Sequence, residues 1–148
     1  MDEAQELIER GRTARNAGNL VDALKLYQEA AELLRQRDQP LRLAHTIRHV
    51  ADIQTHMRLF EEAQANYAEA LTVYRSNPET AKLDLSNTLR GYALLAQSTN
   101  DNESAHAMWA EARDLYRAMD VKAGVEEAER HLRHLDVPTR SFLAERKI

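Results

Sequence analysis

One pattern of small and large side chains occurs three times in this chain, at intervals of 40 and then 42 residues. Its copies are Ala23, Tyr27, Ala30 and Leu34; Ala63, Tyr67, Ala70 and Tyr74; and Ala105, Trp109, Ala112 and Tyr116. A shorter pattern precedes each copy, as Leu7 and Gly11, Ile47 and Ala51, and Leu89 and Ala93. A fixed period of this length is typical of repeat proteins, in which each unit buries its apolar face against its neighbour.

The spacing of apolar residues within each copy predicts helices with one buried stripe. The expected helices span approximately 3–16, 20–36, 40–57, 60–75, 78–98, 101–119 and 122–135. Polar residues next to prolines, in Asp38-Gln39-Pro40 and Ser76-Asn77-Pro78, predict helices that begin with proline in the first turn. Gly18, Arg58-Leu59 and Asn100 are expected in tight turns.

No Gly-rich or Pro-rich linker divides the 148 residues, which predicts one all-α domain, 1–148. Its expected parts are three antiparallel helix pairs at about 4–36, 40–76 and 78–119, a capping helix at about 122–135 and a basic tail, 137–148. The helix at 122–135 carries apolar residues on one face and charge elsewhere, as a cap on the end of a stack needs.

These repeats resemble the tetratricopeptide repeat, which has small residues at the helix crossing and an aromatic residue four positions after the key alanine. The resemblance covers about residues 4–119. The period is longer than the usual one of about 34 residues and is similar to the longer variant of the kinesin light chain type. The resemblance implies an α-solenoid, a right-handed superhelix whose concave face is lined by the first helix of each pair and binds a peptide or another protein.

If that resemblance holds, the residues that project from the first helices line the binding groove. They are Gln5, Ile8, Arg12, Arg15 and Asn16 in the first unit; His45, Arg48, His49, Asp52 and His56 in the second; and Asn87, Arg90, Leu94, Gln97 and Ser98 in the third. Four of them are arginines and one is a carboxylate, although the whole chain has a net charge of −4.

A basic groove on an acidic protein predicts an acidic ligand or a C-terminal carboxylate, which arginine can bind in a bidentate manner. The alternative is a solvated face whose arginines pair with neighbouring carboxylates, for example Arg12 or Arg48 with Asp52. The carboxylate clamp of the chaperone-binding members is not matched, because Ile8 and Arg12 occupy two of its places.

A second cluster, His45, His49, Asp52 and His56, lies on one face of a single expected helix. His45, His49 and Asp52 are a weak candidate for a metal site, since histidines at i and i+4 can share a metal. A fortuitous polar stripe is the favoured interpretation, because Arg48 is adjacent and a two-histidine spacing is a weak motif. Protonation of these histidines near pH 6 is a further possibility. His131 and His134 are expected on solvated surface.

Composition excludes several other classes of protein. The chain has no cysteine, which removes disulfides, thiolate metal sites and a cysteine nucleophile. It has no Gly-rich phosphate loop, no apolar run suited to a signal or a membrane span, and no excess of basic residues. We therefore expect a cytoplasmic protein without a cofactor, without catalytic residues, and without nucleic acid or membrane as a partner.

Three functions remain from the sequence alone. The first is a non-enzymatic adaptor that binds a protein or peptide in the groove. The second is self-association, because three repeats are few and the tail or an exposed end of the stack could form a homodimer. The third, remote, is a metal-binding or metal-dependent protein through the histidine stripe.

Overall fold

The computed structural model describes the backbone of residues 1–146 and the side chains of residues 1–136. The described backbone forms helices only: α1 (Glu3–Asn16), α2 (Leu20–Gln36), α3 (Pro40–His56), α4 (Phe60–Ser76), α5 (Lys82–Ser98), α6 (Asn102–Ala118) and α7 (Lys122–Arg146). The helices divide into two compact units, Met1–Thr80 with α1 to α4 and Ala81–Ile148 with α5 to α7. This confirms the predicted all-α repeat fold of successive helix pairs. That the units form one domain stays a prediction.

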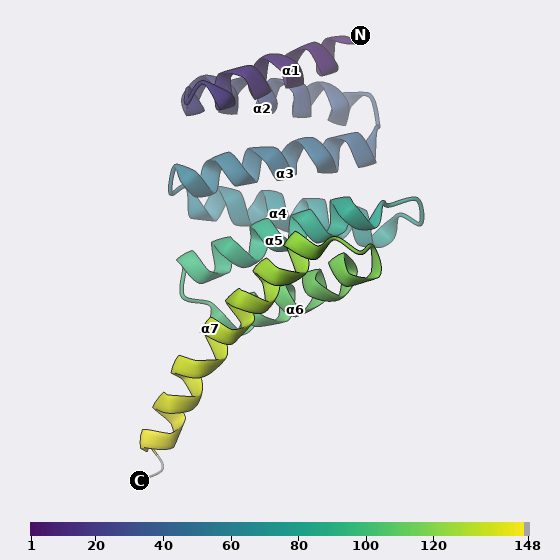
Figure 1. Cartoon of the computed structure of the whole chain (residues 1–148). Coiled ribbons are helices and arrows are strands. Elements are labelled where there is room, and N and C mark those ends of the chain that lie inside the picture. The colour runs from purple at the N-terminus through teal and green to yellow at the C-terminus, as the bar shows by residue number, and fades with distance from the viewer. Residues whose placement is uncertain (147–148) are drawn as a thin grey trace. The chain divides into compact units, whose positions relative to one another are not determined.

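In the first unit, α1 pairs with α2 and α3 pairs with α4, and α2 also packs on α3 (Figure 1). The alanines of the repeated pattern, among them Ala23 and Ala63, are fully buried where the helices of a pair approach each other. Tyr27 and Tyr67 fill the space between the helices and are also buried. Small residues beside one large residue thus provide the close helix contact that the repeat predicted.

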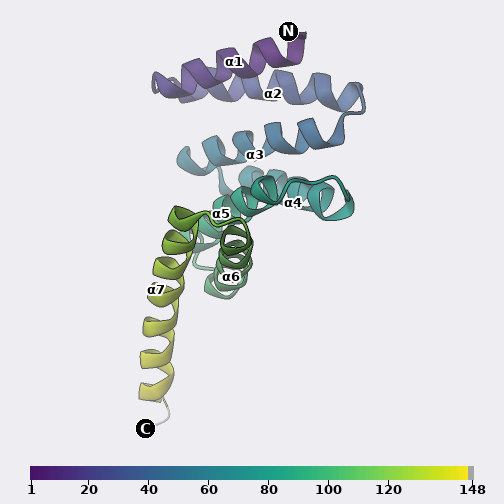
Figure 2. The same cartoon turned by 45° about the vertical axis from the view of Figure 1, so that its right-hand side comes forward.

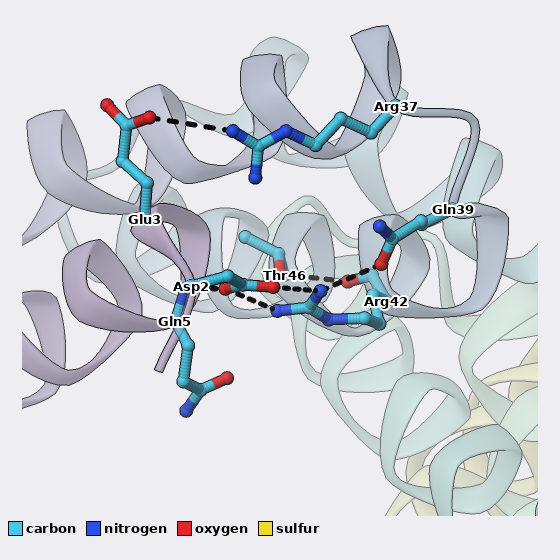
Figure 3. A network of polar contacts seen from close by, with 7 residues as sticks. All are labelled: Asp2, Glu3, Gln5, Arg37, Gln39, Arg42 and Thr46. Carbon is cyan, nitrogen blue, oxygen red and sulfur yellow. Dashed lines mark hydrogen bonds and ion pairs between the residues drawn. The ribbon is translucent and has the colours of Figure 1, made fainter.

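The start of α1 is tied to the start of α3 by a polar network (Figure 3). Asp2 accepts a hydrogen bond of 2.7 Å from the backbone N–H of Gln5 and so caps α1. Its carboxylate also binds Arg42 of α3 at 2.8 Å, and Arg42 donates to Gln39. The hydrogen bond from Arg42 lowers the pKa of Asp2 to about 2.

In the second unit, α5 pairs with α6, and α7 packs on α6 (Figure 2). Its core includes Trp109 and Ala105 of α6 together with Ala128, Leu132 and Leu135 of α7. Near the start of α7, Gly124 lies directly against the ring of Tyr116, so that a Cβ atom at this position would meet the ring Cγ at 2.5 Å.

Five connections between the described helices have the same geometry. In each, one residue adopts a left-handed conformation after the helix end: Gly18, Asp38, Arg58, Asn100 and Asp120, with φ between 53° and 84°. The next residue donates its N–H to a carbonyl five residues earlier, as Asn19 does to Ala14 and Leu59 to Gln54, each at 2.8 Å. These hydrogen bonds are those of the Schellman motif, which satisfies the free carbonyls of a helix end.

The connection before α5 differs from the expectation that Pro78 opens this helix. Instead, Asn77 Oδ1 accepts from the N–H of Glu79, and the Thr80 hydroxyl donates to the carbonyl of Tyr74. These local bonds hold residues 77–80 in a turn, so α5 begins at Lys82. Before α3, Pro40 does occupy the first turn, Asp38 lies in the left-handed turn, and the N-cap residue Gln39 makes no side-chain capping hydrogen bond.

Helix α7 corresponds to a further first helix of the repeat. The ring of Tyr27 in α2 stacks on His49 in α3, and the ring of Trp109 in α6 stacks on His131 in α7, and the partners are 22 positions apart in both cases. In this register Ala128, Leu132 and Leu135 match the buried Thr46, Val50 and Ile53.

The opposite face of α7 carries charge where α3 is apolar. Glu129 and Arg133 stand at the positions of Ile47 and Ala51, which α3 buries. Helix α7 thus has one buried and one charged face, and its role as a cap stays a prediction. The helix continues to Arg146, beyond the predicted end near residue 135. The side chains of the predicted basic tail, 137–148, lie outside the described residues.

Candidate functional site

The first helices of the first unit, α1 and α3, present a cluster of charged and aromatic side chains, which we name the α1–α3 face. It consists of Arg12, Arg15, His45, Arg48, His49 and Asp52. All six belong to the set predicted from the sequence. Ile8, also predicted here, is a core residue with 7% of its surface exposed, and so it does not belong to this surface.

His49 lies at the centre of the α1–α3 face. Its ring stacks on the ring of Tyr27 at 5.5 Å between centroids, and the edge of His45 meets it at 4.8 Å. The Arg15 guanidinium lies 3.2 Å from His49 Nδ1. Because a guanidinium only donates hydrogen bonds, Nδ1 must be the acceptor, and the imidazole is the neutral tautomer with its proton on Nε2.

This environment keeps His49 uncharged in neutral and mildly acidic solution. Burial lowers its pKa to about 3, and the nearby positive charges of Arg48, Arg15 and Arg12 act in the same direction, together with His45. The suggestion that His49 takes up a proton near pH 6 is therefore wrong. The sequence showed the stripe of histidines but not that one of them is covered by an aromatic ring.

Arg48 and Asp52 form an ion pair of 3.0 Å on α3, and the Tyr67 hydroxyl of α4 donates a hydrogen bond to the same carboxylate. Both members of the ion pair are largely buried, with 14% and 18% of their side-chain surfaces exposed. Burial raises the pKa of Tyr67, and the neighbouring carboxylate raises it further. The alternative of Arg48 pairing with Asp52 is thus confirmed, and this pair is part of the contact between α3 and α4.

Arg12 and Arg15 have weaker contacts with carboxylates than Arg48 has. Arg12 is 54% exposed in its side chain, and its carboxylate partner, Glu9, is 3.9 Å away at the same exposed surface. Arg15 is half-buried, and its hydrogen bond goes to the neutral His49. Of the three arginines on the α1–α3 face, only Arg48 is closely paired with a carboxylate.

In the second unit, the predicted site residues are mostly bound to neighbours. Arg90 of α5 holds Glu127 of α7 with two hydrogen bonds, one of them 2.9 Å, and this contact lowers the pKa of Glu127. Asn87 accepts from the Tyr116 hydroxyl and Gln97 from the Trp109 indole, each at 2.7 Å. Leu94 packs at the edge of the core, and Ser98 is exposed. Sequence reasoning missed Glu127, although α7 in the register of a first helix would have indicated it.

The remaining predicted positions are surface residues. Gln5 is half-buried and Asn16 and His56 are exposed, whereas His131, expected on solvated surface, is half-buried against Trp109. Burial lowers the pKa of His131. Across the described residues, no group of three or more His, Asp or Glu side chains is arranged to hold a metal ion. At the weak candidate site, Asp52 is already bound to Arg48 and Tyr67, which leaves it poorly suited to be a ligand with His45 and His49.

A cavity of about 610 Å³ opens on a different surface of the first unit, between α1 and α2. Its lining is Glu9, Arg10, Thr13, Ala14, Ala17, Asn19, Asp22, Lys25, Leu26 and Glu29. In the next helix pair, the positions equivalent to Arg10 and Thr13 are Val50 and Ile53, which are buried. The α1–α2 surface is therefore a polar version of a surface that the repeat buries elsewhere.

Comparisons with known proteins place the chain by its fold. A family model described as Tetratricopeptide repeat matches residues 42–118. A solved structure of BtubC (BKLC) from P. vanneervenii is similar with a TM-score of 0.69 and 16% identity, over 90% of this chain and 65% of that one. A tetratricopeptide repeat protein from Parabacteroides merdae ATCC 43184 is similar with a TM-score of 0.59 and 18% identity, over 90% of this chain and 53% of that one. The chain thus spans between about half and two thirds of the length of these two proteins.

None of the curated proteins compared with the chain matches it, so its family rests on the family model and on the helix crossings. Within the described residues, no helix combines the length and apolar character needed to cross a lipid bilayer. The family model covers more than half of the sequence, and the helix pairs have the small and aromatic residues at the crossings that the repeat requires. The chain belongs to the tetratricopeptide repeat family.

Proposed function

We propose that this chain is a non-enzymatic binding module that holds a segment of another protein on the exposed face of its first helices. Tetratricopeptide repeats generally mediate protein–protein interactions. The α1–α3 face is the part of this chain that we assign to the partner. An acidic segment is the partner that its charge favours, and a location in the cytoplasm stays a prediction.

The observation that carries this proposal is the contrast between the repeated and the unrepeated residues. The repeated alanines and aromatic residues are buried and build the helix contacts. Arg12 has no counterpart of its kind in the other repeats, where Asp52 and Leu94 stand in its place. Side chains that differ between repeats and remain accessible are free to determine which partner binds.

Self-association by stacking of the ends is less well supported. The surface of α1 and α2 that faces away from α3 carries Arg10 and Thr13, and the free face of α7 carries Glu129 and Arg133. Glu129 is already paired with Arg117 at 2.8 Å, but burying the charges of Arg10 and Arg133 without partners is costly. We therefore favour a different protein as the partner over a second copy of this chain.

A photo-crosslinking experiment tests the surface without assuming anything about charge. A photoreactive amino acid is introduced at Asn16 or His56, which are exposed at the ends of α1 and α3. The matched controls carry it at Arg10 or Lys25, which line the cavity between α1 and α2. The tagged variants are irradiated in lysate of the source organism, and the crosslinked proteins are identified by mass spectrometry.

We expect one protein to be crosslinked from Asn16 and His56 and not from the control positions. Crosslinks from the control positions alone would move the binding surface to the α1–α2 cavity and contradict the proposal. Crosslinks from Asn16 or His56 to a second copy of this chain would support the homodimer instead.

A further inference from the structure

We infer that Arg12 and Arg15 form an anion-binding site for the side-chain carboxylates of a segment rich in Glu or Asp, and that His49 positions Arg15 for this ligand. This inference rests on the proposed function and specifies the chemistry of its partner. Three groups carry it: two guanidinium groups on α1 and a neutral imidazole on α3.

Arg12 and Arg15 are three residues apart on α1 and therefore lie on the same side of the helix. Arg15 contacts His49 directly, and the positive charges of both arginines lower the pKa of His49 and oppose the rise in the pKa of Tyr27 that burial causes, so both lie within electrostatic range of the stack of Tyr27 and His49. They form one cluster and are not two unrelated surface charges.

The partner of Arg15 is a neutral side chain. The hydrogen bond of 3.2 Å to His49 Nδ1 orients the guanidinium without neutralising it, because the imidazole carries no charge. His49 is itself held in place by the stack on Tyr27 and by the edge of His45. The guanidinium has five N–H groups, so donors remain for a ligand after this hydrogen bond is made.

The charges of this cluster do not cancel. Arg12, Arg15 and Arg48 contribute three positive charges, and Asp52 balances the one on Arg48. Glu9 lies on the exposed rim, 3.9 Å from Arg12. The cluster is therefore positive on a chain with a net charge of −4, and a positive site on an acidic protein favours anionic partners over cationic ones.

The spacing of the two guanidinium groups favours a ligand with more than one carboxylate. Two guanidinium groups one helical turn apart can bind two carboxylates in sequence, each through paired N–H groups. A single C-terminal carboxylate would engage only one of them fully. A segment with consecutive Glu or Asp residues satisfies both, and we assign the site to such a segment.

The test uses a fluorescently labelled hexaglutamate peptide and the full chain, with binding measured by fluorescence anisotropy at low ionic strength. The wild-type chain is compared with Arg12→Gln, Arg15→Gln and the double variant. The matched control is Arg10→Gln, which removes the same charge from the same helix but on the side of the α1–α2 cavity. We expect the double variant to bind at least tenfold more weakly and the control to bind within twofold of the wild type.

Two substitutions of His49 separate positioning from packing. His49→Asn places a carbonyl oxygen near the position of Nδ1, whereas His49→Leu fills the space without an acceptor. We expect His49→Leu to weaken binding several-fold and His49→Asn to restore most of it. Circular dichroism and urea unfolding of both variants confirm that the helices are intact before binding is compared.

Several outcomes would overturn the inference. Hexaglutamine bound as tightly as hexaglutamate would show that charge is not recognised. Equal losses in Arg10→Gln and Arg15→Gln would show only a general electrostatic attraction. Equal binding by the Asn and Leu variants of His49 would remove its positioning role. A partner crosslinked from Asn16 whose binding survives in the double arginine variant would leave the proposed function intact and refute this inference alone.

Discussion

Gly124 illustrates how a single residue can reverse a general rule. Replacing glycine by alanine in a helix normally stabilises it by about 1 kcal/mol. Here the new Cβ would lie 2.5 to 2.7 Å from ring atoms of Tyr116, which is itself buried. Overpacking of this kind costs about 1–3 kcal/mol. The absence of a side chain at this position is thus a requirement of the contact between α6 and α7.

We expect Gly124→Ala to lower the free energy of unfolding by about 1 kcal/mol, measured by urea denaturation, because the clash outweighs the gain in helix propensity. The control is the same substitution in a Tyr116→Ala background, where the ring is absent and Gly124→Ala should become stabilising. A stabilising effect in the wild-type background would contradict the close contact.

His49 should make stability depend on pH. Its pKa falls from 6.5 to about 3 on folding, so the unfolded chain binds one more proton than the folded chain between these values. Stability conferred by the neutral imidazole is therefore fully present above pH 6.5 and is lost progressively as the pH falls toward 3. The expected loss is about 1 kcal/mol for each pH unit in this window.

The measurement is urea unfolding of the wild type and of His49→Asn between pH 5 and pH 8. The variant lacks this titrating group, so the difference in unfolding free energy should shift in its favour as the pH falls below 6.5. Carboxylates and His131 titrate in both proteins and cancel in the difference. A difference that does not change with pH would show that His49 is accessible to protons.

The sequence predicted which residues occupy a helix face but not what each one touches. Periodicity placed Arg12, His49 and Asp52 on one face of the first helices, and of these Arg12 is exposed, whereas His49 and Asp52 are largely covered by other side chains. It also placed Ile8 there, although this side chain reaches the core. The bond between Arg15 and His49, and the stack of His49 on Tyr27, depend on distances between different helices. Such distances follow from the packing of the alanines and could not be read from spacing along one helix.

Pairs of helices are locked by polar contacts that differ from repeat to repeat. Between α3 and α4, the Tyr67 hydroxyl binds Asp52. In the equivalent positions between α5 and α6 stand Trp109 and Leu94, and the indole instead donates to Gln97 at 2.7 Å. The aromatic residue fills the same place, while its polar partner has moved. The packing at this crossing is therefore constant, and the hydrogen bond is specific to each pair.

A double-mutant cycle measures the contact between α3 and α4. We expect Asp52→Leu and Tyr67→Phe to be each destabilising, and the double variant to lose about 1–3 kcal/mol less than the sum of the two, because one interaction is removed twice. Thermal and urea unfolding give the three differences. Effects that add within about 0.5 kcal/mol would show that the hydroxyl and the carboxylate are not coupled.

Helix boundaries were predictable where the backbone geometry repeats. The five connections with a left-handed residue fell within two residues of their expected places. The start of α5 was missed by four residues because Asn77 and Thr80 bond to the nearby backbone in place of extending the helix. Local side-chain bonds of this kind compete with helix formation and are invisible to periodicity.

On the scale of the whole molecule, the two terminal helix surfaces are both polar. Arg10 and Thr13 on α1, and Glu129 and Arg133 on α7, stand where the inner repeats have buried apolar residues. Repeat proteins need such polar ends, because an apolar end would stack on another molecule. The polar outer faces of α1 and α7 therefore disfavour the stacking of one copy on another through these faces.

We expect static light scattering to give the mass of one chain for the wild type at every concentration measured. The double substitution Glu129→Ile with Arg133→Ala places on α7 the residues that α3 has at the equivalent positions. It should expose an apolar face, so that the chains associate and the measured molar mass rises with protein concentration. The control carries Glu61→Ile with Glu62→Ala on the exposed side of α4 and should remain monomeric. A wild type that forms dimers would contradict the proposed role of α7.

The five left-handed turns also determine where this chain can change in length. Each turn is fixed by a hydrogen bond between residues five positions apart, so one added residue would break that bond and change the path by which the chain enters the next helix. The connection at residues 77–81 has no such turn and is held by the local bonds of Asn77 and Thr80, so among the described connections it is the one where we expect a designed loop to disturb the flanking helices least. New sequence added there would lengthen the protein while the frame of each helix stays as it is.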